Sequence, residues 1–165
     1  ELGHLVKDAL KDGGYCPDYL TNQIISEEAN KSAFGIILDG YPRTMTQFEY
    51  LTEHFDVKHY IHLDAPYDVL VEAAMNRIQC SVCNKIWSAV FREEDCCSCQ
   101  ERTWKKRFDD DKSIYPKRYE NYVELTSPII ESVKDLKNYK KILNFNNPNV
   151  FTEIQDWVKL SNQNI

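Results

Sequence analysis

Residues 34–47 read FGIILDGYPRTMTQ, and this stretch decides the fold class of the chain. A short apolar run at 34–38 ends in Asp39, and a turn then leads through Arg43 to a helix-start signal at Thr44. The pattern predicts a buried strand that delivers a carboxylate and a guanidinium to one edge of a sheet. Ligands of open α/β sheets collect outside the carboxyl ends of the strands, so we expect Asp39 and Arg43 to line a small-molecule site.

The chemistry of Asp39 and Arg43 narrows the ligand. A planar guanidinium binds phosphate through parallel hydrogen bonds, and a carboxylate suits the hard metal ion that accompanies a phosphate. These two residues therefore indicate a phosphate site with a metal ion. From this segment alone, a strand that ends in a turn with an incidental ion pair is the alternative.

Strands and helices alternate along the rest of the chain. Apolar spacing predicts strands at 34–38, 60–63 and 141–145, and helices at 17–30, 44–54, from Pro66, at 115–136 and at 150–158. Pro128 is expected to kink or divide the helix at 115–136. This alternation is typical of right-handed crossovers and a parallel sheet, so the predicted class is α/β.

Five of the six cysteines lie within residues 80–99, where the helical period is lost. Cys80 and Cys83 form one C-x2-C hook, and Cys96 and Cys99 form a second one, 12 residues later. Two such hooks can surround a tetrahedral Zn²⁺, so we expect a small zinc ribbon. Cys97 is an alternative third ligand, and free or disulfide-bonded cysteines are the alternative to a metal site.

Three arginines flank the cysteine-rich segment: Arg77 before it, and Arg107 and Arg118 after it. Phosphoryl transfer needs positive charge distributed around oxygens that gain negative charge, and three arginines on a hinged module can supply that charge. Solvated surface arginines with no role in a site are the alternative reading of these residues taken alone.

Length and charge limit the possible functions. The chain has 165 residues, enough for one core and a small appended module. Its net charge of -6 argues against general binding to nucleic acid or to an anionic membrane. No apolar run is long enough to cross a bilayer. We expect the protein to be cytoplasmic, with the mitochondrion as the other possible compartment. Separately, we expect it to be a monomer.

The order and spacing of Asp39, Arg43 and Gln47 resemble the signature of the adenylate kinase family. The resemblance implies that Arg43 binds the phosphate of AMP, that Gln47 reads its base, and that Asp39 holds Mg²⁺ through water. It also implies that Gly14 and Cys16 line the adenine of AMP.

The same resemblance extends to the cysteine-rich segment. Some family members carry a structural zinc in a lid that closes over the triphosphate. By this likeness Arg77 binds the triphosphate, and Arg107 and Arg118 grip the phosphoryl group that moves from ATP or GTP to AMP. The implied domains are the remainder of the region that binds the nucleoside monophosphate (1–30), a core (31–78), a lid with a zinc ribbon (79–117) and a core (118–165). The implied fold has three layers around a parallel sheet, as in P-loop nucleoside monophosphate kinases.

The chain departs from the family in two respects. No G-x-x-x-x-G-K-[ST] phosphate loop is present, and the first strand that the family places before it is not found either. We expect these residues to be part of a longer protein, and this chain alone to be inactive as a kinase. Ala73 stands where the family usually has an arginine that stacks on the donor base, so the choice between ATP and GTP stays open.

Two alternatives belong to other functional classes. One is a non-catalytic relative that binds a nucleotide or a protein partner through the same scaffold. The other is a zinc ribbon that binds nucleic acid, which the basic residues at 102–107 favour and the acidic balance of the chain opposes.

Overall fold

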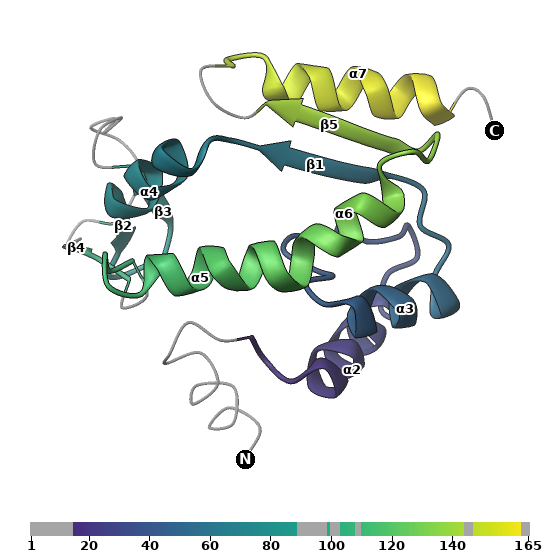
Figure 1. Cartoon of the computed structure of the whole chain (residues 1–165), viewed down its shortest axis with the longest axis horizontal. Coiled ribbons are helices and arrows are strands. Elements are labelled where there is room, and N and C mark those ends of the chain that lie inside the picture. Colours follow the sequence, from purple (N-terminus) through teal and green to yellow (C-terminus); the bar gives the residue numbers. More distant parts are fainter. Residues whose placement is uncertain (1–14, 89–98, 100–102, 108–109, 144–146, 163–165) are drawn as a thin grey trace. The chain divides into compact units, whose positions relative to one another are not determined.

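The computed structural model describes residues 15–88, 99, 103–107, 110–143 and 147–162, which belong to two compact units (Figure 1). The first unit comprises Glu1–Asp64 and Arg118–Ile165, and the second comprises Ala65–Lys117. None of the helices within the described residues is long and apolar enough to cross a membrane.

The first unit is built around a pair of parallel strands, which confirms the predicted α/β class. Its elements are α2 (Asp18–Ala29), α3 (Met45–His54), β1 (Tyr60–Asp64), most of α5 (Tyr115–Asn121), η1 (Tyr122–Thr126), α6 (Ser127–Val133), β5 (Tyr139–Leu143) and α7 (Val150–Asn162). β1 pairs with β5 in register from Tyr60 opposite Tyr139 to Asp64 opposite Leu143. Figure 1 shows α7 running beside β5.

The helices start where the sequence predicted. Thr44 has an extended backbone before α3, and its Oγ1 accepts a hydrogen bond from the Gln47 backbone N at 3.2 Å. Pro17 and Pro66 occupy the positions before α2 and α4, where a missing N–H costs nothing. Local capping chemistry therefore sets these boundaries.

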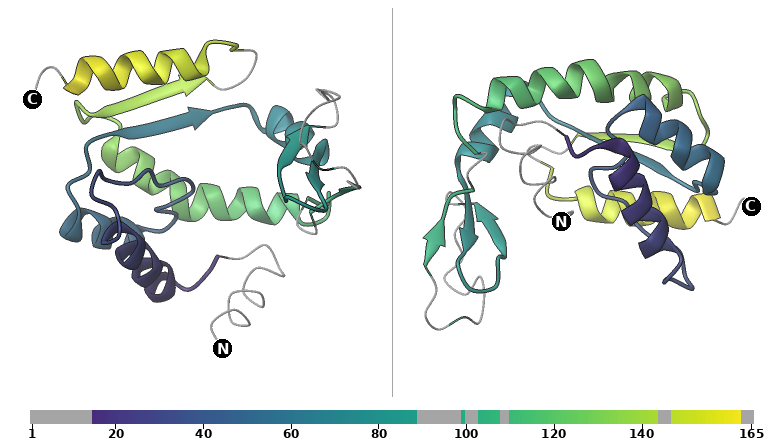
Figure 2. Two further views of the ribbon diagram at one scale, coloured as in Figure 1. Left: turned by 180° about the vertical axis from the view of Figure 1, so that it is seen from behind. Right: turned by 90° about the horizontal axis from the view of Figure 1, so that it is seen from below.

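The core of the first unit lies among its helices and β5. α3 packs against both α2 and α6, and Figure 2 shows α2 and α3 side by side in both views. The buried apolar side chains of these elements are Leu20, Leu51, Ile129, Val133 and Ile142. Burying a leucine-sized side chain contributes about 2 kcal/mol, so each member of this cluster stabilises the unit appreciably.

The helix predicted at 115–136 is divided, as Pro128 led us to expect. α5 passes into the π-helix η1, and α6 begins again at Ser127 with Pro128 in its first turn. A proline is tolerated there because the first N–H groups of a helix have no partner within it. The wide turn of η1 ends at Thr126, which takes part in the site described below.

The strand predicted at 34–38 is wrong. The segment is not assigned to a strand, and its side chains are solvent-exposed apart from a half-buried Leu38; Phe34 is 102% exposed and Ile37 98%. β1 and β5 are the only strands in their sheet among the described residues, and neither pairs with this segment. An extended segment becomes a strand only where its N–H and C=O groups find partners, and an apolar run does not supply them.

The second unit contains α4 (Tyr67–Met75), β2 (Arg77–Cys80), β3 (Ile86–Ser88) and β4 (Trp104–Lys105). Its three strands form an antiparallel sheet in the order β3-β2-β4. β2 follows α4 almost directly (Figure 2). Arg77, which we expected on the helix from Pro66, is therefore the first residue of β2 instead.

Candidate functional site

The backbone of Arg43 is held from two sides. Its N–H donates to Gln47 Oε1 at 2.8 Å, and its carbonyl oxygen accepts from Thr126 Oγ1 at 2.9 Å. Gln47 belongs to α3 and Thr126 is the last residue of η1. π-helical turns frequently occur at functional sites, and this one places a hydroxyl against the loop that carries Arg43.

The side chain of Arg43 is oriented as well. Its Nε donates to the Gly40 carbonyl oxygen at 2.7 Å, and its Cζ lies 5.2 Å from the centre of the Tyr15 ring. Tyr15 is in turn 3.5 Å from Thr126, measured from Oη to Oγ1. Arg43 nevertheless remains exposed. A guanidinium that is held in one orientation and still reaches solvent can bind an anion with little loss of side-chain entropy.

Gly40 is required by this arrangement, and we expect Gly40→Ala to impair it. Gly40 has φ +71°, and a Cβ placed on it would lie 2.7 Å from Arg43 Nη2. Because the end of an arginine side chain can swing away, the main consequence is a displaced guanidinium rather than a large loss of stability. If Arg43 binds the phosphate of AMP, as the resemblance implies, we expect the affinity of the complete protein for AMP, measured by calorimetry, to weaken about tenfold.

Gly35→Ala is the matched control for that prediction. Gly35 also has a positive φ of +90°, but no atom lies within 4 Å of a Cβ added there. Both variants carry a backbone strain of about 1 kcal/mol, and Gly40→Ala alone displaces Arg43. Equal AMP affinities in the two variants would contradict the role assigned to the Gly40 contact.

Gln47 is almost fully buried, with 2% exposure, and both ends of its amide are bonded. Oε1 accepts from the Arg43 backbone N, and Nε2 donates to Asp18 Oδ1 at 2.8 Å. Because a backbone N–H can only donate and a carboxylate can only accept, the amide has one possible orientation. The base-reading role of Gln47 stays a prediction, and in this structure its side chain supports the Arg43 loop.

Tyr41 belongs to the same loop as Arg43, and its side chain is buried. Its hydroxyl donates to Asn22 Oδ1 at 2.7 Å, with a second contact to the Gln47 carbonyl oxygen at 3.2 Å. Burial raises the pKa of Tyr41 to about 12, and the nearby Tyr50 and Asp18 act in the same direction. The hydroxyl therefore stays protonated and remains a donor at any physiological pH.

The raised pKa of Tyr41 predicts alkaline destabilisation. The folded state holds this proton more tightly than the unfolded chain, whose tyrosine pKa is near 10. The contribution of the protonated Tyr41 hydroxyl to the free energy of unfolding is therefore complete below pH 10 and is lost as the pH rises from 10 to 12. We expect the free energy of unfolding in urea to fall by on the order of 2 kcal/mol across this interval. Tyr41→Phe should flatten that fall, and an equally steep profile in the variant would contradict the assignment.

Asp39 is exposed, and none of the described residues forms an ion pair or a hydrogen bond with its carboxylate. The incidental ion pair with Arg43 that the sequence left open is therefore not formed. The Mg²⁺ role of Asp39 that the resemblance implies stays a prediction, and a hydrated cation is the form in which Mg²⁺ is usually bound.

Three of the four predicted metal ligands come together in the second unit. The sulfur atoms of Cys80, Cys83 and Cys99 all lie within 4.8 Å of one another. The hook is closed by a turn in which the Asn84 N donates to the Cys80 carbonyl oxygen at 3.1 Å, and Asn84 has a φ of +59°. Three converging thiols are the donor set that Zn²⁺ prefers.

The three flanking arginines are divided between the units, Arg77 and Arg107 in the second and Arg118 in the first. Arg77 Nε lies 3.2 Å from Asp110 Oδ2, and the Asp110 side chain is fully buried. A buried carboxylate next to a partly exposed guanidinium fixes the position of that guanidinium. Arg107 and Arg118 are both partly buried and have interaction partners.

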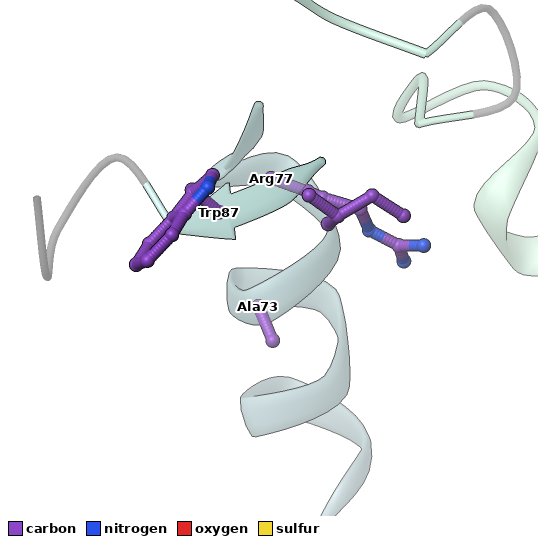
Figure 3. A pocket seen from close by; sticks show the side chains of 4 residues that line it. Ala73, Arg77 and Trp87 are labelled. Carbon is purple, nitrogen blue, oxygen red and sulfur yellow. The ribbon is translucent and has the colours of Figure 1, made fainter. Parts of the chain in front are cut away.

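Ala73 and Arg77 border a hollow of about 330 Å³, together with Ile86 and Trp87 (Figure 3). Figure 3 shows the Trp87 indole and the Arg77 side chain pointing to opposite sides of the β2–β3 pair, as expected from the pairing of Trp87 with Ile78 and of Arg77 with Ser88. The departure at Ala73 thus lies at an open surface next to an indole ring.

Several predicted residues lie outside the described part of the chain, namely Gly14, Cys96 and Cys97. Cys16 is described, half-buried, and not disulfide-bonded. Sequence reasoning missed Tyr15, Asp18, Asn22 and Thr126. Only tertiary contacts reveal these residues, because Asp18 reads as an ordinary first-turn carboxylate and Thr126 is 83 residues from Arg43.

A family model and the individual relatives that match this chain all belong to the adenylate kinases. The family model of adenylate kinase matches residues 1–138. An adenylate kinase of Fervidobacterium nodosum is 33% identical over 145 residues, which cover 82% of this chain and 66% of that protein. One from Thermosipho melanesiensis is 36% identical, covering 79% and 66%, and one from Ureaplasma urealyticum is 30% identical, covering 96% and 78%. The chain thus spans just under two thirds of the length of the first two relatives.

Proposed function

This chain belongs to the adenylate kinase family, and on that premise we propose that the complete protein transfers the terminal phosphoryl group of ATP or GTP to AMP. The observation that carries the proposal is the geometry of Arg43. Gln47 and Thr126 fix its backbone, and the Gly40 carbonyl and the Tyr15 ring fix its guanidinium, yet the residue is exposed. Such an arginine is suited to bind a phosphate.

In this proposal Arg43 binds the phosphate of AMP, and Gln47, Gly14 and Cys16 lie around its base. Gln47 begins with both ends of its amide bonded, so reading a base requires it to share or exchange one hydrogen bond. Because the amide is buried and oriented in advance, little entropy is lost when it makes that contact.

In the proposed reaction, arginine side chains surround the phosphoryl group as it moves from the triphosphate to AMP. Arg77, Arg107 and Arg118 spread positive charge over the oxygens of the transferring group, and Asp39 is the carboxylate that would hold Mg²⁺. Mg²⁺ would supply charge neutralisation at the phosphate oxygens. In the complete protein the residues of this chain bind AMP and supply arginines around the transferring group, and closure of the lid excludes water so that AMP rather than water accepts the phosphoryl group.

In the same proposal, the second unit is a lid whose fold is stabilised by a structural Zn²⁺ ion. The Cys80, Cys83 and Cys99 sulfurs, which all lie within 4.8 Å of one another, would hold the ion, and Cys96 is proposed as the fourth ligand. We also propose that the parallel pair β1–β5 is one part of a larger parallel sheet, which forms the middle layer of a three-layer fold. The protein is proposed to act as a monomer.

A second candidate is a non-catalytic relative that binds AMP or a partner. Ala73 at the hollow beside Trp87 favours it, since the usual base-stacking arginine is replaced there. A coupled assay of ADP formation with the complete protein separates the two candidates. AMP-dependent turnover with ATP or GTP supports the kinase, whereas AMP binding with turnover at background level supports the alternative.

A further inference from the structure

We propose that Asp18 is a positioning residue for the AMP site, acting on Arg43 through the buried amide of Gln47; this inference rests on the function proposed above. The connection consists of two hydrogen bonds of 2.8 Å, from Gln47 Nε2 to Asp18 Oδ1 and from the Arg43 N to Gln47 Oε1. It links helix α2 directly to the peptide group that precedes the Arg43 side chain.

The donors and acceptors on either side of the Gln47 side-chain amide allow only one orientation of that amide. An amide turned around would bring its NH₂ group against the Arg43 N–H, which is donor against donor. The Asp18 carboxylate excludes that orientation because it accepts only from Nε2. Without it, the amide of a residue with 2% exposure keeps an unpaired donor and loses one of the two contacts that select its orientation.

A second contact from the same helix supports the loop. Asn22 follows Asp18 by four residues, so the two side chains share one face of α2. Asn22 accepts from the hydroxyl of Tyr41, which lies two residues before Arg43 and is 9% exposed. One face of α2 therefore fixes the loop on both sides of Pro42, through Tyr41 and through Gln47.

The experiment uses Asp18→Ala in the complete protein. We expect the KM and the dissociation constant for AMP to rise about tenfold, while the KM for the triphosphate changes less than twofold. Asp18→Asn keeps an acceptor oxygen for Gln47 Nε2 and should recover most of the loss. A merely structural role would lower the melting temperature and leave the constants for the two substrates unchanged relative to each other.

Glu27→Ala is a matched control on the same helix. Glu27 accepts from the Gln23 amide at 2.9 Å, which reproduces the carboxylate–glutamine pair at an exposed position. Loss of an exposed pair costs little, so this variant should bind AMP like the wild type.

Two further results decide the proposal. If Asp18→Ala does not fold, Asp18→Glu tests the same bond, because its longer side chain displaces the carboxylate from Gln47 Nε2, and we expect a severalfold rise in the AMP KM with the triphosphate KM unchanged. Wild-type affinity for AMP in every folded variant of the network overturns the inference alone. A wild-type protein that does not bind AMP overturns the proposed function and this inference with it.

Discussion

Replacing Arg43 with alanine is expected to raise the KM for AMP about 100-fold in the complete protein and to reduce turnover. The variant loses a charge-assisted, bidentate contact to phosphate, for which a loss of about 3 kcal/mol is typical. The loss should be large because the neighbours of Arg43 already fix its orientation, so the wild type binds with little ordering cost. Steady-state kinetics with AMP varied at saturating triphosphate measures the effect.

Two variants sharpen the Arg43 test. Arg43→Lys keeps the charge and loses the planar fork, so it should recover only part of the affinity. Lys58→Ala removes a cation that forms an exposed ion pair with Asp56, and it should leave AMP kinetics unchanged. An Arg43→Ala enzyme with wild-type kinetics would remove the basis of the proposed AMP site.

Replacing Cys80 with serine is expected to abolish zinc binding and to unfold the second unit. The Cys80 sulfur is part of the three-thiol group, and the residue is fully buried. Described residues of this unit contribute few buried apolar side chains, so ligand binding would supply much of its folding free energy; structural zinc sites are worth about 10–16 kcal/mol at pH 7. Zinc content by atomic absorption should fall from one per chain to zero, and a low-temperature melting transition should appear.

Cys16→Ser is the matched control for the zinc test. Cys16 is half-buried, belongs to the first unit and is not a member of the thiol group. This variant should keep its zinc and its melting profile. A Cys80→Ser protein that retains a full equivalent of zinc, or a wild type that contains none when purified without chelators, would contradict the structural metal site.

The elements that could be predicted are those with local causes. α3 has its cap in Thr44, α2 and α4 begin after a proline, and the division at Pro128 follows from a missing N–H. The strand predicted at 34–38 failed because apolar composition reports a preference for burial, whereas a strand also needs a neighbouring backbone. In the described structure Phe34 and Ile37 have no such neighbour and face solvent.

The sequence indicated candidate site residues, whose roles stay predictions, but not the residues that support them. Arg43, Gln47 and the C-x2-C spacing could be found because their chemistry is tied to short motifs. The groups that hold Arg43 could not, since Tyr15, Asp18 and Thr126 are common residue types with no spacing that marks them.

The amino-acid sequence by itself determined the family, the α/β class, the starts of the helices α2, α3 and α4, and the candidate phosphate-site and thiol residues, because each depends on neighbours within a few positions. Only the tertiary structure decided how Arg43 is oriented, which way the Gln47 amide points and which cysteines meet. The physical reason is that these properties depend on donors and acceptors brought together from distant segments, such as the Thr126 hydroxyl on the Arg43 carbonyl. Hydrogen-bond geometry at that range is set by packing of α2, α3 and η1, which no local pattern encodes.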